Sequence, residues 1–264
     1  MLRNAKDLQG LTIHATDGEI GKVDQFYFDD DSWAIRYLTV NTGGWLDGRL
    51  VLISPISVTA QADWESKRLH VSLTKKQVEN SPSVDTHEPV SRQHEIEYMG
   101  YYGYPFYWGG SNLWGPASYP GELALPLGMP MAAAQSGHVL SDSADSHLRS
   151  SQEVIGYYMG ASDGEIGHLD GFIVDDESWA IRYVEVATRN WWPGKKVLVS
   201  PAWIERVSWS ESKVYTGLSR ETIQEAPDYV ESMPVTRLYE DQLFSHYGRP
   251  PYWVRESDHE VAFP

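Results

Sequence analysis

Hydrophobic and polar residues alternate in short runs over the first quarter of the chain, a pattern typical of small β proteins. Residues 12–15 predict a short strand, and apolar positions spread over residues 20–28 predict a longer one. Asp17-Gly18 lies between them and is typical of a tight turn. Gly21, inside the strand pattern, predicts a bulge or a sharp bend.

The pattern continues with strands and then changes to helices. WAIRYLTV (33–40) and LVLISP (50–55) predict two further strands, and Val58 with RLHVSL (68–73) predicts two short ones. TKKQVENSP (74–82) starts with an N-cap Thr and ends before Pro, which predicts a short helix. VSRQHEIEYMGYYG (90–103) predicts a second helix that stops near Gly103. We expect five or six short strands followed by one or two helices.

The same pattern occurs a second time, 146 positions later. TDGEIGKVDQFYFDDDSWAIRYLTV (16–40) becomes SDGEIGHLDGFIVDDESWAIRYVEV (162–186). After one deleted residue the correspondence continues, and YYGYPFYW (101–108) matches HYGRPPYW (246–253). A repeat of this length is a duplicated domain and is too long for a solenoid unit.

The duplication predicts the domain organisation. The first repeat with its C-terminal helices covers 1–108, the second covers 148–254, and 255–264 form a tail. Residues 109–147 are rich in Gly, Pro, Ser and Ala and predict a linker. Apolar side chains such as Trp114 and Leu123 indicate that part of this linker lies along a domain surface.

The combined DGEIG turn, WAIRY strand and VLISP strand resemble the PRC-barrel domain, over roughly Leu8–Leu73 and Val154–Leu218. That domain is a small β-barrel named after the cytoplasmic part of the photosynthetic reaction-centre H subunit. The resemblance implies a mainly β fold with short helices, made of two small PRC-type β-barrels related by pseudo-twofold symmetry. Members of the family are regarded as docking or adaptor modules, not enzymes. Related barrels occur in a ribosome-maturation factor, whose RNA-related role does not transfer to this acidic chain.

Composition narrows the classes of partner. The formal net charge is −16, which disfavours binding to nucleic acid and to anionic membranes. The chain has no Cys, so disulfides and thiolate metal sites are excluded. No apolar run is long enough for a signal peptide or a membrane span. We expect a cytoplasmic protein without direct membrane insertion, in which a homo-oligomer remains possible.

Candidate catalytic and metal motifs are weak. HEIEY (94–98) lacks the second His of a zinc-protease helix. The acidic runs 29–31 and 175–177 lack calcium-loop spacing, so we interpret them as solvated hairpin turns. Asp17 with Glu19, repeated at 163 and 165, is interpreted as a turn acid beside an edge residue, with Arg36 and Arg182 as possible salt-bridge partners. We expect no catalytic residue, no cofactor and no functional metal.

The aromatic segments after the last helix of each repeat are the best functional lead. Exposed Tyr and Trp in loops suit protein interfaces. The alternative is that they cover the end of each barrel and the contact between the barrels. The candidate partner-binding residues are Tyr101, Tyr102, Tyr104, Tyr107, Trp108, Tyr247, Tyr252 and Trp253.

These observations favour a non-enzymatic structural or adaptor protein, a double PRC-barrel scaffold that binds an unknown protein partner. One alternative is a photosynthesis or electron-transfer accessory resembling the reaction-centre H subunit. Another is an enzyme of unrecognised mechanism.

Overall fold

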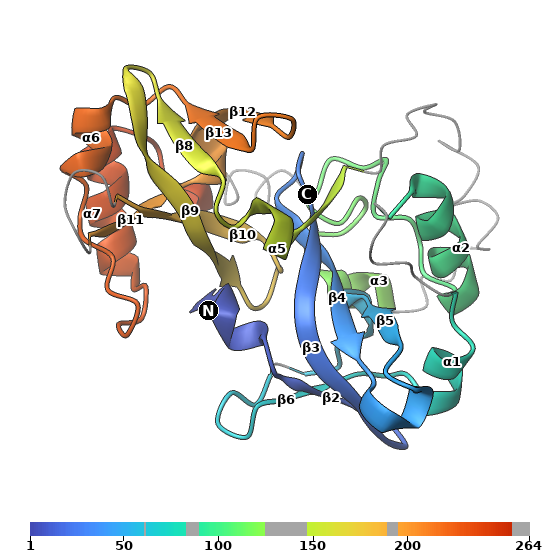
Figure 1. Cartoon of the computed structure of the whole chain (residues 1–264). Helices are drawn as coiled ribbons and strands as arrows, with labels where there is room; N and C mark the ends of the chain where they lie inside the picture. The colour runs from blue at the N-terminus through green and yellow to red at the C-terminus, as the bar shows by residue number, and fades with distance from the viewer. Residues whose placement is uncertain (61, 83–89, 125–146, 189–194, 255–264) are drawn as a thin grey trace, which may run out of the picture. The chain divides into compact units, whose positions relative to one another are not determined.

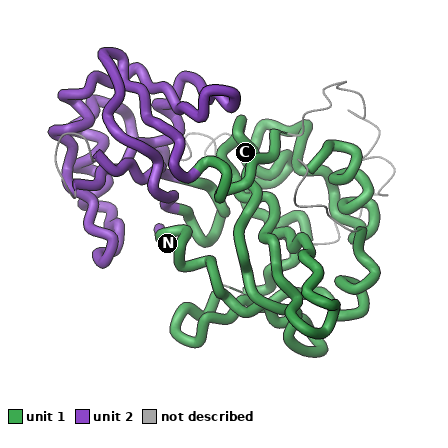
Figure 2. Tube along the Cα trace, viewed as in Figure 1, with its two compact units in different colours: residues 1, 3–154, 174–181 green, residues 2, 155–173, 182–264 purple. Residues whose placement is uncertain are grey.

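The computed structural model describes residues 1–60, 62–82, 90–124, 147–188 and 195–254. The chain divides into two compact units (Figure 2). Unit 1 contains residues 1, 3–154 and 174–181, and unit 2 contains residues 2, 155–173 and 182–264. Among the described residues, no helix is both long and apolar enough to cross a bilayer.

The sheet of the first repeat has six strands, built around one long strand, β3 (Figure 1). Its order is β5-β4-β3-β2-β6, and β7 also pairs with β3. All pairs are antiparallel except β2 with β6, which are parallel. The strands are β2 (Thr12–Ala15), β3 (Gly18–Asp29), β4 (Ala34–Asn41), β5 (Leu50–Ile53), β6 (Arg68–His70) and β7 (Leu148–Ser150).

The sheet of the second repeat has seven strands in the equivalent order. That order is β11-β10-β9-β8-β13-β12, with β1 paired to β9. The parallel pair recurs as β8 with β13. The strands are β1 (Leu2–Asn4), β8 (Tyr158–Ala161), β9 (Gly164–Asp175), β10 (Ile181–Ala187), β11 (Lys196–Val199), β12 (Ile204–Ser208) and β13 (Lys213–Thr216).

Short helices follow the strands in each repeat. The four predicted ones, α1, α2, α6 and α7, begin and end close to where the sequence predicts, whereas α3, α5 and the 3-10 helices were not predicted. In unit 1, α1 and α2 lie on the same side of the sheet, beside β5 (Figure 1). The α-helices are α1 (Lys75–Glu79), α2 (Arg92–Tyr102), α3 (Pro120–Ala124), α5 (Ser151–Val154), α6 (Arg220–Gln224) and α7 (Arg237–Tyr247). The 3-10 helices are η1 (Ala5–Leu8), η2 (Gly43–Leu46), η3 (Pro55–Ser57) and η4 (Pro201–Trp203).

Polar side chains cap these helices. Thr74 accepts a hydrogen bond from the Gln77 N–H in a capping box at α1, and Ser219 accepts one from the Thr222 N–H at α6. The longer helices α2 and α7 both end at a glycine in the left-handed region, Gly103 (φ 72°) and its equivalent. These contacts are local in sequence, which is why the sequence predicts them.

Gly21 allows β3 to bend closely against the end of β4. A Cβ atom at Gly21 would lie 2.0 Å from the Asn41 carbonyl oxygen. At Gly167, its equivalent, a Cβ would lie 2.0 Å from the Ala187 carbonyl oxygen. Real Cβ atoms do not approach a carbonyl this closely, so only glycine fits. The bend predicted from the sequence therefore comes from a backbone-to-backbone approach.

The turn after β3 contacts the equivalent turn of the second repeat, which belongs to unit 1. Ala34 and Ala180 form an antiparallel bridge. The N–H that follows each alanine donates to the carbonyl that precedes the other, at 2.9 and 2.7 Å. Trp33 (φ 54°) and Trp179 (φ 60°) adopt the same left-handed backbone. The contact is thus made by equivalent residues on both sides.

Unit 1 also contains a reciprocal pair of ion pairs. Arg149 at β7 donates to Asp30 across 2.8 Å, and Arg3 donates to Asp176 across 3.1 Å. The two pairs occupy equivalent positions of the two repeats. The N-terminal segment of each repeat therefore binds the turn of the other repeat.

The expected mainly β fold with short helices is confirmed. Two details differ from the expectation. Among the described residues neither sheet closes into a barrel, because β5 and β11 each pair with one strand only and form an open edge. Val58 forms only an isolated bridge with Val71 and no strand. In the predicted linker, Trp114 and Leu123 are buried, and residues 125–146 lie outside the described residues.

Candidate functional site

Each aromatic segment packs over a buried carboxylate. In unit 1, α2 begins after Ser91, so that Glu95 on its first turns faces the sheet. Glu95 is fully buried. The chain reverses after Gly103, and this brings the Tyr107 hydroxyl back to donate a short hydrogen bond to the Glu95 carboxylate. The segment is thus held by a polar contact as well as by apolar packing.

Two further groups meet the Glu95 carboxylate. The Tyr37 hydroxyl of β4 donates to it across 3.2 Å, and an Arg92 guanidinium nitrogen lies 2.8 Å from its second oxygen. Burial raises the pKa of Glu95 to about 7, although Arg92 and the two hydroxyls favour the ionised form. Burial and the nearby carboxylate raise the pKa of Tyr37 well above its usual range. The hydroxyls therefore remain protonated donors.

Arg36 completes this cluster from the neighbouring position on β4. Its side chain is buried between two rings, 4.0 Å from the Tyr107 centroid and 4.7 Å from the Trp114 centroid. It donates to Ser32 across 2.8 Å and lies 3.6 Å from an Asp29 oxygen. The expected pairing of Arg36 with Asp17 or Glu19 is therefore wrong.

The acids of the DG turn have another role. Asp17 accepts a hydrogen bond from the Lys75 N–H (2.7 Å), and Asp163 accepts one from the Arg220 N–H (2.8 Å). Each aspartate thus ties its turn to the start of a short helix. This contact joins residues far apart in sequence and has a structural purpose.

Unit 2 contains the same cluster with equivalent residues. Glu240 accepts hydrogen bonds from Tyr183 (2.8 Å) and Tyr252 (3.0 Å), and Arg237 lies 3.1 Å from its other oxygen. Arg182 lies over the Tyr252 ring at 4.1 Å. Burial raises the pKa of Glu240 as it does that of Glu95. We name these two sets of residues the aromatic clusters.

The sequence-predicted partner residues divide by burial. Tyr101 is exposed, at 41%. Tyr104, Tyr107 and Tyr247 are buried. The half-buried members of the set are Tyr102, Trp108, Tyr252 and Trp253.

The acids and arginines that hold these aromatic residues were missed from the sequence. Their signal is an Arg-x-x-Glu pair, Arg92 with Glu95, which recurs at the same place as Arg237 with Glu240. Spacing of three residues places both side chains on one helix face. A comparison of the two repeats could have found this pair.

A stacked arginine and tryptophan form the outer edge of each aromatic cluster. Arg92 lies 4.3 Å from the Trp108 ring centroid, and Arg237 lies 3.8 Å from that of Trp253. The Arg237 side chain is 54% exposed. Arginine and tryptophan are enriched among interface residues that contribute most to binding. The Arg92 side chain is 23% exposed, so the stack of unit 2 is the more accessible of the two.

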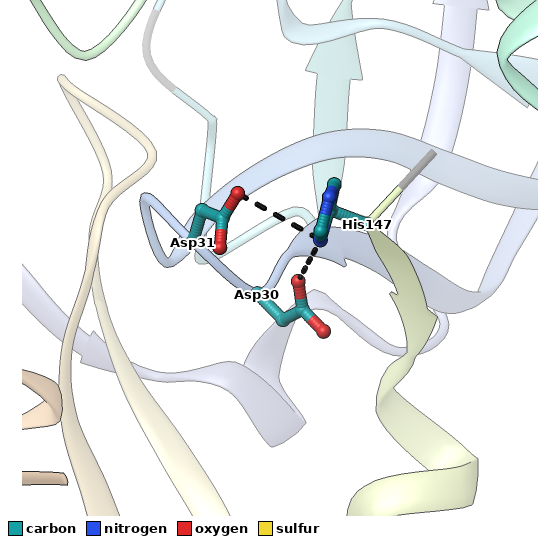
Figure 3. A group of neighbouring side chains, drawn as sticks. All are labelled: Asp30, Asp31 and His147. Carbon is teal, nitrogen blue, oxygen red and sulfur yellow. Dashed lines mark hydrogen bonds and ion pairs between the residues drawn. The ribbon is translucent and has the colours of Figure 1, made fainter. Parts of the chain in front are cut away.

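A separate group in unit 1 has metal-ligand chemistry (Figure 3). The His147 Nδ1 lies 3.1 Å from an Asp30 oxygen and 3.7 Å from an Asp31 oxygen. Asp30 is mostly buried by these contacts and by Arg149, with a side-chain exposure of 10%. The expectation that residues 29–31 form a solvated turn is therefore wrong for Asp29 and Asp30, which are buried or mostly buried, and holds only for the exposed Asp31.

Unit 1 also has a shallow groove of about 660 Å³ beside the start of β3. Glu19, Lys22 and Asp24 contribute its charged lining, and Trp45 lies at one side. The Trp45 indole N–H donates to the Ile20 carbonyl, and the Lys75 ammonium lies 4.4 Å from its ring. The groove is open, and Glu95 is not among the residues that line it.

Comparison with known proteins identifies part of the chain. The PRC-barrel domain family matches residues 2–78. No curated protein matches the chain. The matched segment begins at β1 and reaches α1, and it contains β2 to β6. Residues 2–78 of this chain are therefore a PRC-barrel domain.

Proposed function

We propose that this chain is a non-enzymatic adaptor that binds another protein through the outer edges of its two aromatic clusters. The observation that carries the proposal is the repetition of the Arg–Trp stack, in Arg92 with Trp108 and in Arg237 with Trp253. The PRC-barrel domain, a general scaffold for protein interaction, supports the same class of function.

The second repeat supports a two-module scaffold. Its strand order repeats that of the matched domain. So do the close approach of Gly167 to the Ala187 carbonyl and the hydrogen bond from the Arg220 N–H to Asp163. We infer that it is a second PRC-type module, related to the first by pseudo-twofold symmetry. Two similar modules in one chain present similar binding edges, which suits a protein that holds partners together.

Burial of the carboxylates argues against the enzymatic alternative. Glu95 has the raised pKa often found in acid–base catalysts. Its carboxylate is nevertheless fully buried, and it is occupied by Tyr37, Tyr107 and Arg92. A catalytic acid must reach the substrate proton within hydrogen-bond distance. A structural role as the anchor of the aromatic segment accounts for its environment.

The experiment compares two replacements on the proposed edges with a matched one elsewhere. Partners are captured from the native host with the wild type, with Trp108→Ala plus Trp253→Ala, and with Trp64→Ala. Trp64 also stacks on an arginine, Arg3, at 4.4 Å, but lies outside both clusters. We expect the double variant alone to lose the captured partner, and calorimetry with that partner to show at least a tenfold weaker affinity.

Equal capture by all three proteins would disprove the role of these edges. Circular dichroism and a melting curve for each variant show whether the fold is retained. Loss of capture by Trp64→Ala as well would point to a different surface.

A further inference from the structure

Asp30, Asp31 and His147 bring three metal-binding atoms together in unit 1 (Figure 3). The contributing atoms lie within 4.8 Å of one another, and the two oxygens are 3.1 and 3.7 Å from Nδ1 of His147. Ligands at about 2.1 Å from a tetrahedral ion are about 3.4 Å apart. The donors therefore surround a point where an ion fits after small side-chain movements.

We propose that Asp30, Asp31 and His147 bind a divalent transition-metal ion such as Zn²⁺. One imidazole nitrogen and two carboxylate oxygens suit Zn²⁺ and its neighbours in the first transition row. Ca²⁺ is a poorer fit because it takes six to eight oxygen ligands. Water completes the coordination on the side of Asp31, whose side chain is 75% exposed.

The backbone holds two of the ligands in place. His147 precedes β7, and its carbonyl accepts a hydrogen bond from the Asp30 N–H at 2.9 Å. The next residues pair with β3, with Leu148 opposite Asp29. Asp30 and His147 therefore lie directly beside the ends of two paired strands, which limit how far they can move.

A neighbouring arginine orients the buried ligand. Arg149 donates to Oδ2 of Asp30 across 2.8 Å, while Oδ1 faces His147. Ligating carboxylates in metal sites are commonly held by such an outer hydrogen bond. Arg149 also offsets one of the two carboxylate charges, so that the acids can lie close together.

The second repeat has no imidazole at the place equivalent to His147. There Met1 stands where the first site has His147. Arg3 binds Asp176 as Arg149 binds Asp30. The first site has an imidazole at this place, and an imidazole can bind a metal.

The test is calorimetric titration of the full chain with Zn²⁺ at neutral pH, in a buffer that does not chelate the ion. We expect saturable binding of one ion and at least a tenfold loss of affinity in both Asp31→Asn and His147→Gln. The matched control is Glu177→Gln, the equivalent of Asp31 in the second repeat, which should bind as the wild type does.

Titration with Co²⁺ gives a second readout, because its visible absorption bands report direct coordination. We expect these bands in the wild type and the control but not in His147→Gln. Absence of saturable Zn²⁺ binding by the wild type would overturn the proposal and leave His147 as an ion-pair partner of the two acids. Unchanged binding by both site variants would overturn it too.

A loss of metal binding in Asp31→Asn can be distinguished from a loss of folding, because Asp31 is exposed. Because Asp31 is on the surface, its replacement by Asn should leave the melting temperature without metal unchanged. The wild type should melt a few degrees higher with Zn²⁺ than without it, since ligands of the folded state stabilise it. Asp31→Asn should lose most of that shift.

Discussion

The Tyr37 hydroxyl on β4 donates a hydrogen bond to the Glu95 carboxylate on α2 across 3.2 Å. Both residues are fully buried. The equivalent bond in unit 2, from Tyr183 to Glu240, is 2.8 Å long. Each repeat therefore joins its sheet to its longest helix through a buried carboxylate, and the cost of burying that charge depends on pH.

The Glu95→Gln variant should change how stability depends on pH. The folded state raises the pKa of Glu95 from 4.5 to about 7, so it binds the proton more tightly than the unfolded chain does. The free energy of unfolding of the wild type therefore falls as pH rises from about 4.5 to about 7, and levels off above that. This contribution amounts to roughly 3 kcal/mol. Gln has no such titration.

Urea unfolding of wild type and variant from pH 4.5 to 8 measures this difference. We expect the wild type to lose stability relative to Glu95→Gln across that range. Glu97→Gln, a replacement of the same kind at an exposed position of the same helix, is the matched control. Parallel curves for wild type and Glu95→Gln would contradict the prediction.

The Gly21→Ala variant should be strongly destabilised. Its Cβ would lie 2.0 Å from the Asn41 carbonyl oxygen, and the backbone would have to move. Overpacking of this kind costs about 1–3 kcal/mol or more. Gly44→Ala is the control, because no atom lies within 4 Å of its Cβ position. Denaturant midpoints compare the two, and equal midpoints would show that β3 can shift without cost.

The Tyr98→Phe variant should weaken the edge of the first sheet. The Tyr98 hydroxyl accepts a hydrogen bond from the Ser54 N–H (3.0 Å) and donates one to the Leu52 carbonyl (3.2 Å). Both backbone groups are buried, so their loss of a partner should cost about 1–3 kcal/mol.

Tyr101→Phe provides the comparison for that measurement. Its hydroxyl donates to the Gln77 carbonyl at an exposed position, where water can replace it. We expect a cost below about 0.5 kcal/mol. Chemical unfolding of both variants tests the difference, and a similar small cost for Tyr98→Phe would argue that water reaches the edge of β5.

Cysteines at positions 34 and 180 should form a disulfide. Ala34 and Ala180 are a non-hydrogen-bonded antiparallel pair, because their bonds lie on the flanking residues. Such pairs have Cα atoms about 4.5 Å apart, within the range for a disulfide. The natural chain has no Cys, so no other pairing competes.

Oxidation of the purified Ala34→Cys plus Ala180→Cys variant tests this contact. We expect an intramolecular bridge, seen as faster migration on a non-reducing gel and as loss of free thiols. Ala34→Cys alone should not show this faster migration. Two free thiols persisting in the oxidised double variant would contradict the reciprocal contact of the two turns.

The internal repetition of the sequence, the strands β2 to β5 and the ends of α1, α2, α6 and α7 could be read from the sequence alone, whereas β1, β7, α3 and α5 were not predicted. The predicted features depend on contacts between residues close in the chain, such as Thr74 with Gln77, or on one glycine that ends a helix. The aromatic segments could also be recognised in the sequence from their composition. Their burial could not be predicted, because it depends on contacts with Glu95 and Arg36, which belong to other elements.

Only the tertiary structure showed which side chains form the hydrogen bonds between elements far apart in the sequence. The edge of β5 is capped at Leu52 by Tyr98, whereas the equivalent Leu198 is reached by Tyr247, one helical turn further along. Alignment of the repeats places Leu243 opposite Tyr98 and so does not reveal the shared role. Positions one turn apart lie on the same helix face, so either can deliver a hydroxyl to the same strand. Local sequence determined the elements, and the geometry of their packing selected the residues that join them.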